Sequence, residues 1–349
     1  MNAMNAMSTR RQSDMRTTCT LGDLMSKRFP DREDLLGPWL RQGESVMLWA
    51  APGTGKTLLT LTIALAVAGG GRFLGWHSPK PRKVLLVDGE MAAEDLQERL
   101  RFLAPTIEGF NLQAASENLT LYTRTLQRAE AGFPDLGERV GRGNEKAGQD
   151  DVMEAAMKCG AELILLDNFS TLSEVSDEND AAAMTPTLAF LMRLKQAKIG
   201  CVLVHHSGKS GDSYRGSSKL ATTFEVIIGL TKIEGSNPAD GAAFKLDWTK
   251  YRRKPCDAVR SRNVQLIEVD GQMAWCNEIS LDDDVRVLLK AVRSGDYRTG
   301  KEIAAALQWA PSKVTTLKAR AQEQKLITGA AWKDYLAAGQ PDGVIVDDF

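Results

Sequence analysis

The segment Ala50-Ala-Pro-Gly-Thr-Gly-Lys-Thr57 combines glycines, a lysine and a hydroxyl in an order that can enclose a phosphate group. Its glycines allow successive backbone N–H groups to turn inward, and a helix beginning directly after them would add the positive end of its dipole. Lys56 would neutralise the β- and γ-phosphates of ATP, and the Thr57 hydroxyl would hold Mg²⁺. Alanine replaces the usual glycine at the first position, but the remaining spacing is intact. The expected nucleotide contacts are Pro52, Gly53, Thr54, Gly55, Lys56, Thr57 and Leu58.

A carboxylate at the end of a nearby strand is the second requirement, because it positions Mg²⁺, usually through water. Four apolar residues precede Asp167 and predict a buried strand that presents this acid at its carboxyl end, where ligands bind in open α/β sheets. We therefore expect Thr57 and Asp167 to form the metal site. The alternative is that Asp167 only caps the segment that follows.

Hydrolysis also requires a group that orients and deprotonates the attacking water. Glu90 is the expected base, because it lies two residues beyond Asp88 at the end of another apolar run, with a flexible glycine between them. Asp88 is the alternative base. Glu90 could instead be an acid that only favours the start of a helix through the helix dipole.

A histidine pair, His205 and His206, ends a further apolar run. One of the two could sense the γ-phosphate and transmit its loss to the following loop. Because side chains alternate along a strand, His205 should turn toward the core and His206 toward the nucleotide. His77 is the only other histidine and no cysteine spacing supports zinc, so the alternative is an ordinary strand-end histidine.

Strands must position these groups, and the chain supplies continuous apolar runs that alternate with helical patterns. Such runs are typical of a parallel sheet covered on both faces by helices, so we expect an α/β fold. The expected strands are 45–50, 83–88, 119–122, 163–167, 200–205 and 226–231, and the expected helices are 56–68, 91–103 and 181–198. Residues 129–149, rich in glycine and charge, are expected to form a surface loop.

The pattern changes after about residue 240. Residues 244–251 and 263–269 are expected strands, and Asp270-Gly271 predicts a hairpin turn before a strand at 272–275.

Residues 282–336 are expected to be helical and to form a small separate domain. A first helix lies near 285–292, and Thr299 with Glu302 forms a capping box for a second at 303–307. Pro311 opens a third, which should turn Val314, Leu317 and Ala321 inward. A short strand is expected at Leu326-Ile327.

Together these motifs resemble the RecA-like P-loop ATPases, and most closely the plasmid-type, RepA-like hexameric replicative DNA helicases. The resemblance covers roughly residues 22–278 and implies a RecA-like core with a mostly parallel central sheet. It is specific for the ATPase superfamily and less specific for helicase activity. The segments that carry it are Gly37-Pro-Trp-Leu40, Gly43-Glu44, Ala50–Thr57, Val87-Asp-Gly-Glu-Met91, Leu165-Leu-Asp167, Val204-His-His-Ser207 and Arg215-Gly-Ser-Ser218.

The resemblance implies a homo-oligomeric ring, usually hexameric, with ATP between neighbouring subunits and cations borrowed from the adjacent subunit. In related ring helicases these cations lie on a late strand as Lys-x-Arg, a pattern that Lys250-Tyr-Arg252 matches. Lys250 would contact the nucleotide, and Arg252 would act as the arginine finger. Arg253 and Arg215 are rivals for that role, and a solvated strand end is the plain alternative.

In such rings, loops after the third and fourth core strands track single-stranded nucleic acid. Residues 207–215 form the second of these loops, where Lys209 and Arg215 supply charge and Tyr214 could stack on a base. A flexible lid is the alternative.

The C-terminal segment is similar to a winged helix-turn-helix domain, and residues 285–333 contain ten Lys or Arg against three acids. Its recognition helix would present Lys313, Lys318 and Arg320, with two threonines between them, to phosphates and base edges. Protein docking and simple packing are the alternatives.

Whole-chain composition indicates no partner, because 44 Lys and Arg nearly balance 45 Asp and Glu among 349 residues. The five cysteines form no C-x-x-C pair, which favours reduced thiols in a cytoplasmic protein. No run approaches the about 18 apolar residues of a membrane helix. We expect a disordered tail at 1–20, an ATPase domain at 21–280, a winged helix-turn-helix-like domain at 281–340 and a tail at 341–349.

The leading hypothesis is an ATP-driven, ring-forming DNA translocase or helicase of plasmid or phage replication, with single-stranded DNA and a replication initiator or other replication protein as partners. An ATP-controlled DNA-binding regulator of replication and a RecA-type recombination or repair ATPase are the alternatives. A small-molecule kinase is the least favoured, because it would not explain the basic C-terminal segment.

Overall fold

The structure is a computed structural model that describes residues 18–128, 133–137, 148–173, 185–207, 222–233, 241–254, 256–279, 283–323 and 325–338. Residues 1–33 and 34–349 form two compact units. Of the predicted tails, residues 1–17 and 341–349 lie outside the described residues.

The smaller unit contains one described helix, α2, Leu21–Ser26. Thr20 caps it, because its hydroxyl accepts from the Asp23 N–H at 3.1 Å while the Asp23 carboxylate accepts from the Thr20 N–H at 3.1 Å. This reciprocal pair satisfies backbone donors that the helix itself cannot satisfy.

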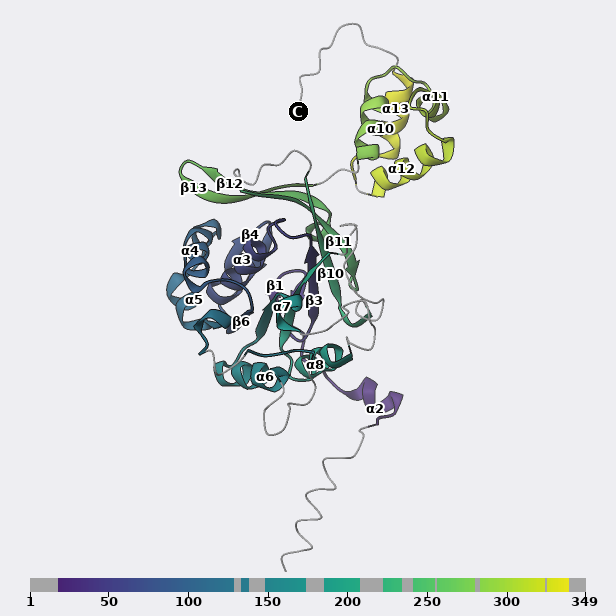
Figure 1. The fold of residues 1–349 in the computed structure, drawn as a ribbon. Coiled ribbons are helices and arrows are strands. Elements are labelled where there is room, and N and C mark those ends of the chain that lie inside the picture. The colour runs from purple at the N-terminus through teal and green to yellow at the C-terminus, as the bar shows by residue number, and fades with distance from the viewer. Residues whose placement is uncertain are drawn as a thin grey trace, which may run out of the picture. The chain divides into compact units, whose positions relative to one another are not determined.

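A nine-stranded sheet forms the centre of the larger unit, in the order β13-β12-β11-β10-β3-β9-β8-β6-β7 (Figure 1). Neighbouring strands from β10 to β7 are parallel. Neighbours from β13 to β10 are antiparallel. The strands are β3 (Ser45–Ala50), β6 (Val84–Asp88), β7 (Leu119–Thr123), β8 (Leu163–Asp167), β9 (Gly200–His206), β10 (Val226–Lys232), β11 (Ala242–Tyr251), β12 (Arg262–Val269) and β13 (Gln272–Ile279). The predicted α/β class with a mostly parallel central sheet is confirmed.

Helices cover both faces of the parallel strands, as the continuous apolar runs predicted (Figure 1). Even-numbered residues of β3, such as Leu48, pack in the cluster with α3, whereas odd-numbered ones, such as Met47, pack with α6 and α8. The helices are α3 (Lys56–Gly69), α4 (Ala93–Leu103) and α5 (Leu112–Asn118) on one face, and α6 (Gly148–Cys159), α7 (Phe169–Leu172) and α8 (Thr185–Gln196) on the other.

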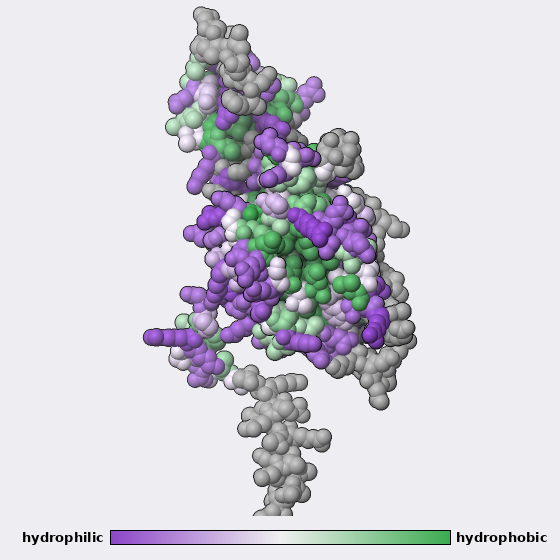
Figure 2. Space-filling view, turned by 90° about the vertical axis from the view of Figure 1, so that its left-hand side faces the viewer, coloured by the Kyte–Doolittle hydropathy of each residue, from purple (hydrophilic) through white to green (hydrophobic). Residues whose placement is uncertain are grey.

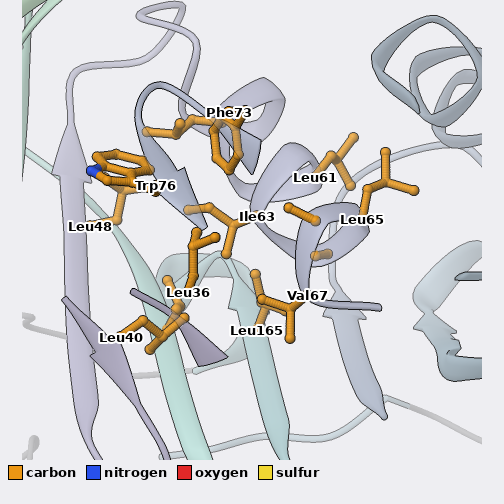
Figure 3. Close-up of a cluster of buried hydrophobic side chains, with 14 of the residues drawn as sticks. Leu36, Leu40, Leu48, Leu61, Ile63, Leu65, Val67, Phe73, Trp76 and Leu165 are labelled. Carbon is orange, nitrogen blue, oxygen red and sulfur yellow. The ribbon is translucent and has the colours of Figure 1, made fainter. Parts of the chain in front are cut away.

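Two short hairpins, which sequence patterns did not reveal, extend the core beside α3. β1 (Asp34–Leu36) pairs with β2 (Leu40–Arg41), and β4 (Gly71–Phe73) pairs with β5 (Trp76–Ser78). Figure 3 shows Leu36, Leu40 and Trp76 from these hairpins gathered with core side chains of β3, α3 and β8. Their buried side chains belong to the same cluster as Leu48 of β3, the strand that leads into the glycine-rich loop.

The predicted hairpin between β12 and β13 is confirmed. Asp270 and Gly271 have φ angles of 52° and 79°, and Val269 pairs with Gln272 across the turn. Two consecutive positive φ angles are the geometry that matches the right-handed twist of adjacent strands, which explains the Asp-Gly pair.

The predicted surface loop is wrong at its C-terminal end. Gly148 and Gln149 open α6, and Gln149 is buried with its side-chain amide donating to the Leu136 carbonyl at 2.8 Å. This hydrogen bond anchors the start of the helix. It also satisfies the polar side chain of Gln149, so a polar residue that suggested an exposed loop is buried here. Residues 129–132 and 138–147 lie outside the described ranges.

The C-terminal helices pack around a hydrophobic core of their own, in which Val314, Leu317 and Ala321 are buried as predicted. They are α10 (Asp283–Arg293), α11 (Gly300–Ala306), α12 (Pro311–Glu323) and α13 (Gly329–Ala337). The Thr299 hydroxyl accepts from the Glu302 N–H at 3.2 Å, but the Glu302 carboxylate accepts from the Arg298 N–H at 2.7 Å. The helix cap is therefore present, with the return bond one residue earlier than a capping box has it.

The predicted strand at Leu326-Ile327 is wrong. These residues form a bend between α12 and α13, and Ile327 is buried in the helical core. Their apolar character comes from this packing, and an apolar pair alone cannot distinguish a strand from a buried bend. None of the helices in the described ranges has the length and hydrophobicity that a membrane span requires.

Candidate functional site

The glycine-rich loop connects β3 to α3 at the carboxyl edge of the sheet. Gly53 and Gly55 have φ angles of 73° and 106°, which only glycine adopts without strain. A Cβ on Gly55 would approach the Ala242 Cβ to 2.9 Å, so this position must also be small. Ala50, which departs from the usual glycine, lies within β3 and pairs with Leu230 and His206. An extended strand residue tolerates a side chain, so the departure does not alter the loop.

Lys56 begins α3 and is buried beneath the loop. Its ammonium donates to the carbonyls of Ala50 at 3.0 Å and Ala51 at 2.9 Å. Burial lowers the pKa of Lys56, and the nearby Asp167 and Glu90 carboxylates oppose that shift. Lys56 therefore holds the loop together and also places a cation beneath the space that the loop encloses.

A pocket of about 480 Å³ adjoins the loop and brings together most of the predicted catalytic residues. Its lining consists of Pro52, Gly53, Gly55, Lys56, Thr57, Leu58, Glu90, Arg99, Phe102, Asp167, Asn168 and His206. Thr54, predicted as a contact, is buried and its hydroxyl donates to the Ala51 carbonyl at 2.8 Å, so it shapes the loop.

Asp167 ends β8, next to Asp88 of β6 in the sheet register, and is almost fully buried. Burial, reinforced by the charge of Asp88, raises the pKa of Asp167 to about 7, although a hydrogen bond with Thr57 and the charge of Lys56 oppose the rise. Its Oδ2 atom has no hydrogen-bond partner among the described residues. A buried carboxylate with an unpartnered oxygen beside a threonine hydroxyl fits a hard cation such as Mg²⁺.

No cluster of three or more His, Cys, Asp or Glu side chains able to hold a metal occurs in the described part of the chain. This arrangement suits Mg²⁺, which is usually bound by one or two protein oxygens together with phosphates and water rather than by a protein cage.

Asp88 and Glu90 have different environments although they are two residues apart. Asp88 is buried, and its Oδ1 accepts from the backbone N–H groups of Glu90 at 3.1 Å and Met91 at 2.7 Å. Burial raises the pKa of Asp88. Glu90 is exposed to the pocket, and its Oε2 accepts from the Asn168 side-chain amide at 2.7 Å. Asp88 thus anchors the turn before α4, whereas the Glu90 carboxylate faces the pocket.

The two histidines at the end of β9 also differ. His205 is fully buried, with its ring 5.2 Å from the ring of Phe169, whereas His206 lines the pocket. The predicted alternation is confirmed. β9 lies between β3 and β8, so His206 ends the strand that separates the phosphate loop from Asp167.

Arg99, Phe102 and Asn168 line the pocket and were missed in the sequence. Asn168 follows Asp167 directly, and Arg99 and Phe102 are three residues apart on α4. The Arg99 guanidinium makes no hydrogen bond or ion pair with any residue that the structure describes, and its charge partly opposes the rise that burial causes in the pKa of Asp88. The helical spacing after Glu90 could have shown that Arg99 and Phe102 lie on one face of a helix. It could not show that this face lines the nucleotide pocket.

Lys250 and Arg252, the predicted borrowed cations, do not line this pocket. Lys250 donates to the Thr222 carbonyl at 3.5 Å, and Arg252 donates to the same carbonyl and lies 3.7 Å from Glu225. Arg253 is less available, because it donates to the carbonyls of Pro38 and Trp39 and pairs with the Glu44 carboxylate at 2.8 Å.

The predicted DNA contacts of the second loop, Lys209, Tyr214 and Arg215, lie outside the described residues. On α12, Lys313 pairs with Asp284 at 2.9 Å and lies 4.2 Å from the Trp309 ring centroid. Lys318 lies 4.8 Å from the Trp332 ring centroid, and Arg320 is exposed in the last turns of the same helix.

Comparison with known proteins gives a family and a distant structural match. A crystal structure of a KaiC-like protein from the hyperthermophilic archaeon Pyrococcus horikoshii OT3 is similar at 12% sequence identity and a TM-score of 0.47, covering 70% of this chain and 94% of that one. No curated protein sequence matches the chain. The model of a family described as AAA domain matches residues 9–212, which include the phosphate loop, Glu90, Asp167 and His206. The chain therefore belongs to the AAA domain family, and its motifs are those of a P-loop ATPase.

Proposed function

We propose that the chain hydrolyses ATP with Mg²⁺ and, as a ring-shaped homo-oligomer, uses that hydrolysis to move along single-stranded DNA as a replicative translocase or helicase of plasmid or phage type. The observation that carries the proposal is the convergence of Lys56, Thr57, Glu90 and Asp167 on one pocket at the carboxyl edge of the sheet. Lys56 and Thr57 begin α3, Asp167 ends β8 and Glu90 follows β6. Together they would supply the cation, metal ligands and base that phosphoryl transfer requires.

Within this site Thr57 and Asp167 would hold Mg²⁺, which when bound would neutralise charge on the β- and γ-phosphates. The backbone amides of the loop and Lys56 would bind the phosphates. Glu90, held by Asn168, would orient the attacking water and accept its proton. Water then adds to the γ-phosphorus as the bond to the ADP leaving oxygen breaks, giving ADP and inorganic phosphate.

Communication between subunits is supported by the position of Lys250 and Arg252. Neither lines the pocket of its own chain, and both donate to the carbonyl of Thr222. Thr222 is the first described residue after the predicted DNA loop, residues 207–215. If Arg252 reached the γ-phosphate of a neighbouring subunit, it would have to leave Thr222. The nucleotide bound to one subunit would thereby change the contacts of Thr222, after the predicted DNA loop, in the neighbouring subunit.

His206 would connect the pocket to the other end of that loop. It lines the pocket, and the N–H of the next residue, Ser207, donates to the Ala50 carbonyl at 3.0 Å. The predicted DNA loop, residues 207–215, begins at Ser207. A chain segment that starts beside His206 and is followed by the Thr222 contact of Lys250 and Arg252 supports coupling of hydrolysis to DNA movement.

Duplex unwinding tests this proposal. Wild-type protein with Mg²⁺ and ATP should displace one strand of a forked duplex, and Lys56→Ala should not, because it removes the cation beneath the phosphates. If wild-type protein hydrolyses ATP but neither unwinds the fork nor translocates along a single strand, the motor part of the proposal fails while the ATPase part stands.

An ATP-controlled DNA-binding regulator is the second candidate, because α10–α13 have a hydrophobic core of their own and α12 carries basic residues. Such a regulator would bind a particular duplex sequence tightly, and its ATP turnover would not respond to single strands. Binding of random and selected duplexes, measured at one salt concentration, distinguishes the two candidates.

A further inference from the structure

Asn168, the residue after Asp167, lies between two neighbouring strand ends. It is 3% exposed, it lines the nucleotide pocket, and its side-chain amide donates to Glu90 Oε2 at 2.7 Å. Asn168 follows β8 and Glu90 follows β6, and these two strands pair in the sheet. Asn168 therefore connects the strand that ends in the proposed metal ligand with the strand that precedes the proposed base.

The cap of α7 determines which way the Asn168 amide faces. Asn168 is the N-cap residue of this helix, and its Oδ1 accepts from the Thr171 N–H at 3.3 Å. Its own backbone N–H donates to the Thr171 hydroxyl at 3.4 Å. If the amide were turned over, its NH2 group would face the Thr171 N–H and its oxygen would face the Glu90 carboxylate, so both hydrogen bonds would be lost. The amide is therefore held with its donor toward Glu90.

The backbone at Glu90 is restrained on both sides. Asp88 Oδ1 accepts from the Glu90 N–H at 3.1 Å, and α4 begins three residues after Glu90. Leu96 and Leu103 of α4 are buried, and Figure 2 shows hydrophobic residues gathered on the face of the core that includes this helix. Packing of α4 therefore holds the chain after Glu90, as Asp88 holds the chain before it.

Gly89 brings the same backbone against the start of α7. Its N–H donates to the Asp167 carbonyl at 3.0 Å, and a Cβ at this position would approach the Thr171 Oγ1 to 2.5 Å. Glycine is therefore required for this close approach. Because the backbone around Glu90 is fixed in these ways, the remaining freedom is that of the Glu90 side chain, and the Asn168 amide restrains it.

We propose that Asn168 is a positioning residue for ATP hydrolysis: its amide fixes Glu90 Oε2, so that the other carboxylate oxygen is presented to the attacking water. The inference rests on the ATPase part of the proposed function, in which Glu90 is the base, and it requires neither DNA nor a ring. A carboxylate held in one rotamer meets the water in a reactive geometry more often, which increases turnover without changing how tightly ATP binds.

Asn168→Ser tests this role. Serine also caps helices well, but its shorter hydroxyl would stay with Thr171 and leave Glu90 without a donor. Turnover should fall by about 10- to 100-fold, as expected for a lost hydrogen bond to a charged group, with little change in ATP affinity. Single-turnover phosphate release and equilibrium binding of a fluorescent ATP analogue measure the two quantities. Asn111→Ser is the matched control and should hydrolyse normally, because Asn111 caps α5 and does not line the nucleotide pocket.

A double-mutant cycle separates positioning from a structural role. Asn168→Ser added to Glu90→Gln should cause no further loss of turnover, because the base through which Asn168 acts is already absent. Asn168→Asp is a second variant, similar in size and also a good helix cap, in which an oxygen replaces the donating NH2 group. At saturating Mg²⁺ it should lose turnover at least as strongly as Asn168→Ser, and circular dichroism identifies the variants that are folded.

Normal turnover by a folded Asn168 variant, or a loss that adds fully to that of Glu90→Gln, would overturn the proposal. Wild-type protein that hydrolyses ATP without moving on DNA would end the motor part of the proposed function and leave the result for Asn168 unaffected. Wild-type protein without ATPase activity would overturn both, since no base would remain for Asn168 to position.

Discussion

At the scale of single residues, the site separates two acids that lie close together in sequence. Asp88 accepts two backbone N–H groups, whereas Glu90 faces the pocket and accepts a hydrogen bond from the Asn168 side-chain amide. A base must be able to approach the attacking water, and only Glu90 combines exposure to the pocket with a fixed position.

Glu90→Gln should therefore retain ATP binding and lose turnover by at least about 100-fold, because the amide cannot accept the proton. Steady-state phosphate release and equilibrium binding of a fluorescent ATP analogue measure the two effects. Glu94→Gln, an exposed acid at the start of α4, is the matched control and should hydrolyse normally. Near-normal hydrolysis by Glu90→Gln would move the base to another residue.

Arg99 is a cation of the pocket without a hydrogen-bond partner among the described residues, and a triphosphate would provide one. Arg99→Ala should weaken ATP binding by about 10- to 100-fold, as expected for a lost hydrogen bond to a charged group. ADP binding should change little, because it lacks the γ-phosphate. Calorimetric titration of both nucleotides measures the ratio, with Arg101→Ala, exposed on the same helix, as the control. Equal weakening of ATP and ADP would contradict a contact to the γ-phosphate.

The buried carboxylate of Asp167 should reduce the stability of the protein when metal and nucleotide are absent. Its pKa of about 7 in the folded protein exceeds the ordinary 3.8, so the stabilisation present below pH 3.8 is lost as pH rises toward 7. Asp167→Asn, measured in EDTA, should therefore raise Tm by several degrees at pH 8 and by much less near pH 4. A Tm advantage that does not change with pH would contradict this account. The same substitution should abolish Mg²⁺-dependent hydrolysis.

At the scale of elements, the junction between β3 and α3 depends on packing against β11. A Cβ on Gly55 would meet Ala242 at 2.9 Å and the Phe244 ring at 3.3 Å, whereas a Cβ on Gly53 would meet nothing within 4 Å. Both glycines have positive φ, so the pair separates backbone strain from packing.

Gly55→Ala should lower the free energy of unfolding by about 1–3 kcal/mol more than Gly53→Ala does, because only Gly55→Ala adds overpacking to the strain of a positive φ. Urea denaturation of both variants measures the difference. Equal losses would mean that Ala242 and Phe244 move away without cost.

Sequence patterns predicted the strands of the parallel sheet because each is a continuous apolar run buried on both faces, as in Leu163–Asp167. They also predicted the ends at which Asp167 and Glu90 lie. They did not predict Arg99 and Phe102 in the pocket, because helical spacing does not show which element a helix face meets. The error at Leu326-Ile327 has a related origin, since burial in a helical bend and burial in a strand select the same residue types.

At the scale of the whole molecule, one chain carries a nucleotide pocket, two cations that lie away from that pocket and a basic helical segment. Arg252 is absent from the described lining of the pocket in its own chain. The proposed ring would supply Arg252 from a neighbour, and a borrowed arginine contributes about 10³- to 10⁵-fold to rate where it has been dissected.

The most direct measurement is the rate of ATP hydrolysis by the full chain in Mg²⁺, with and without single-stranded DNA, alongside Lys56→Ala. The account predicts hydrolysis by the wild type, a rise in that rate when single-stranded DNA is added, and no hydrolysis above background by Lys56→Ala. A wild-type rate that is zero, or that equals the rate of Lys56→Ala, would contradict the pocket as an ATPase site, and a rate indifferent to DNA would contradict its role in a DNA motor.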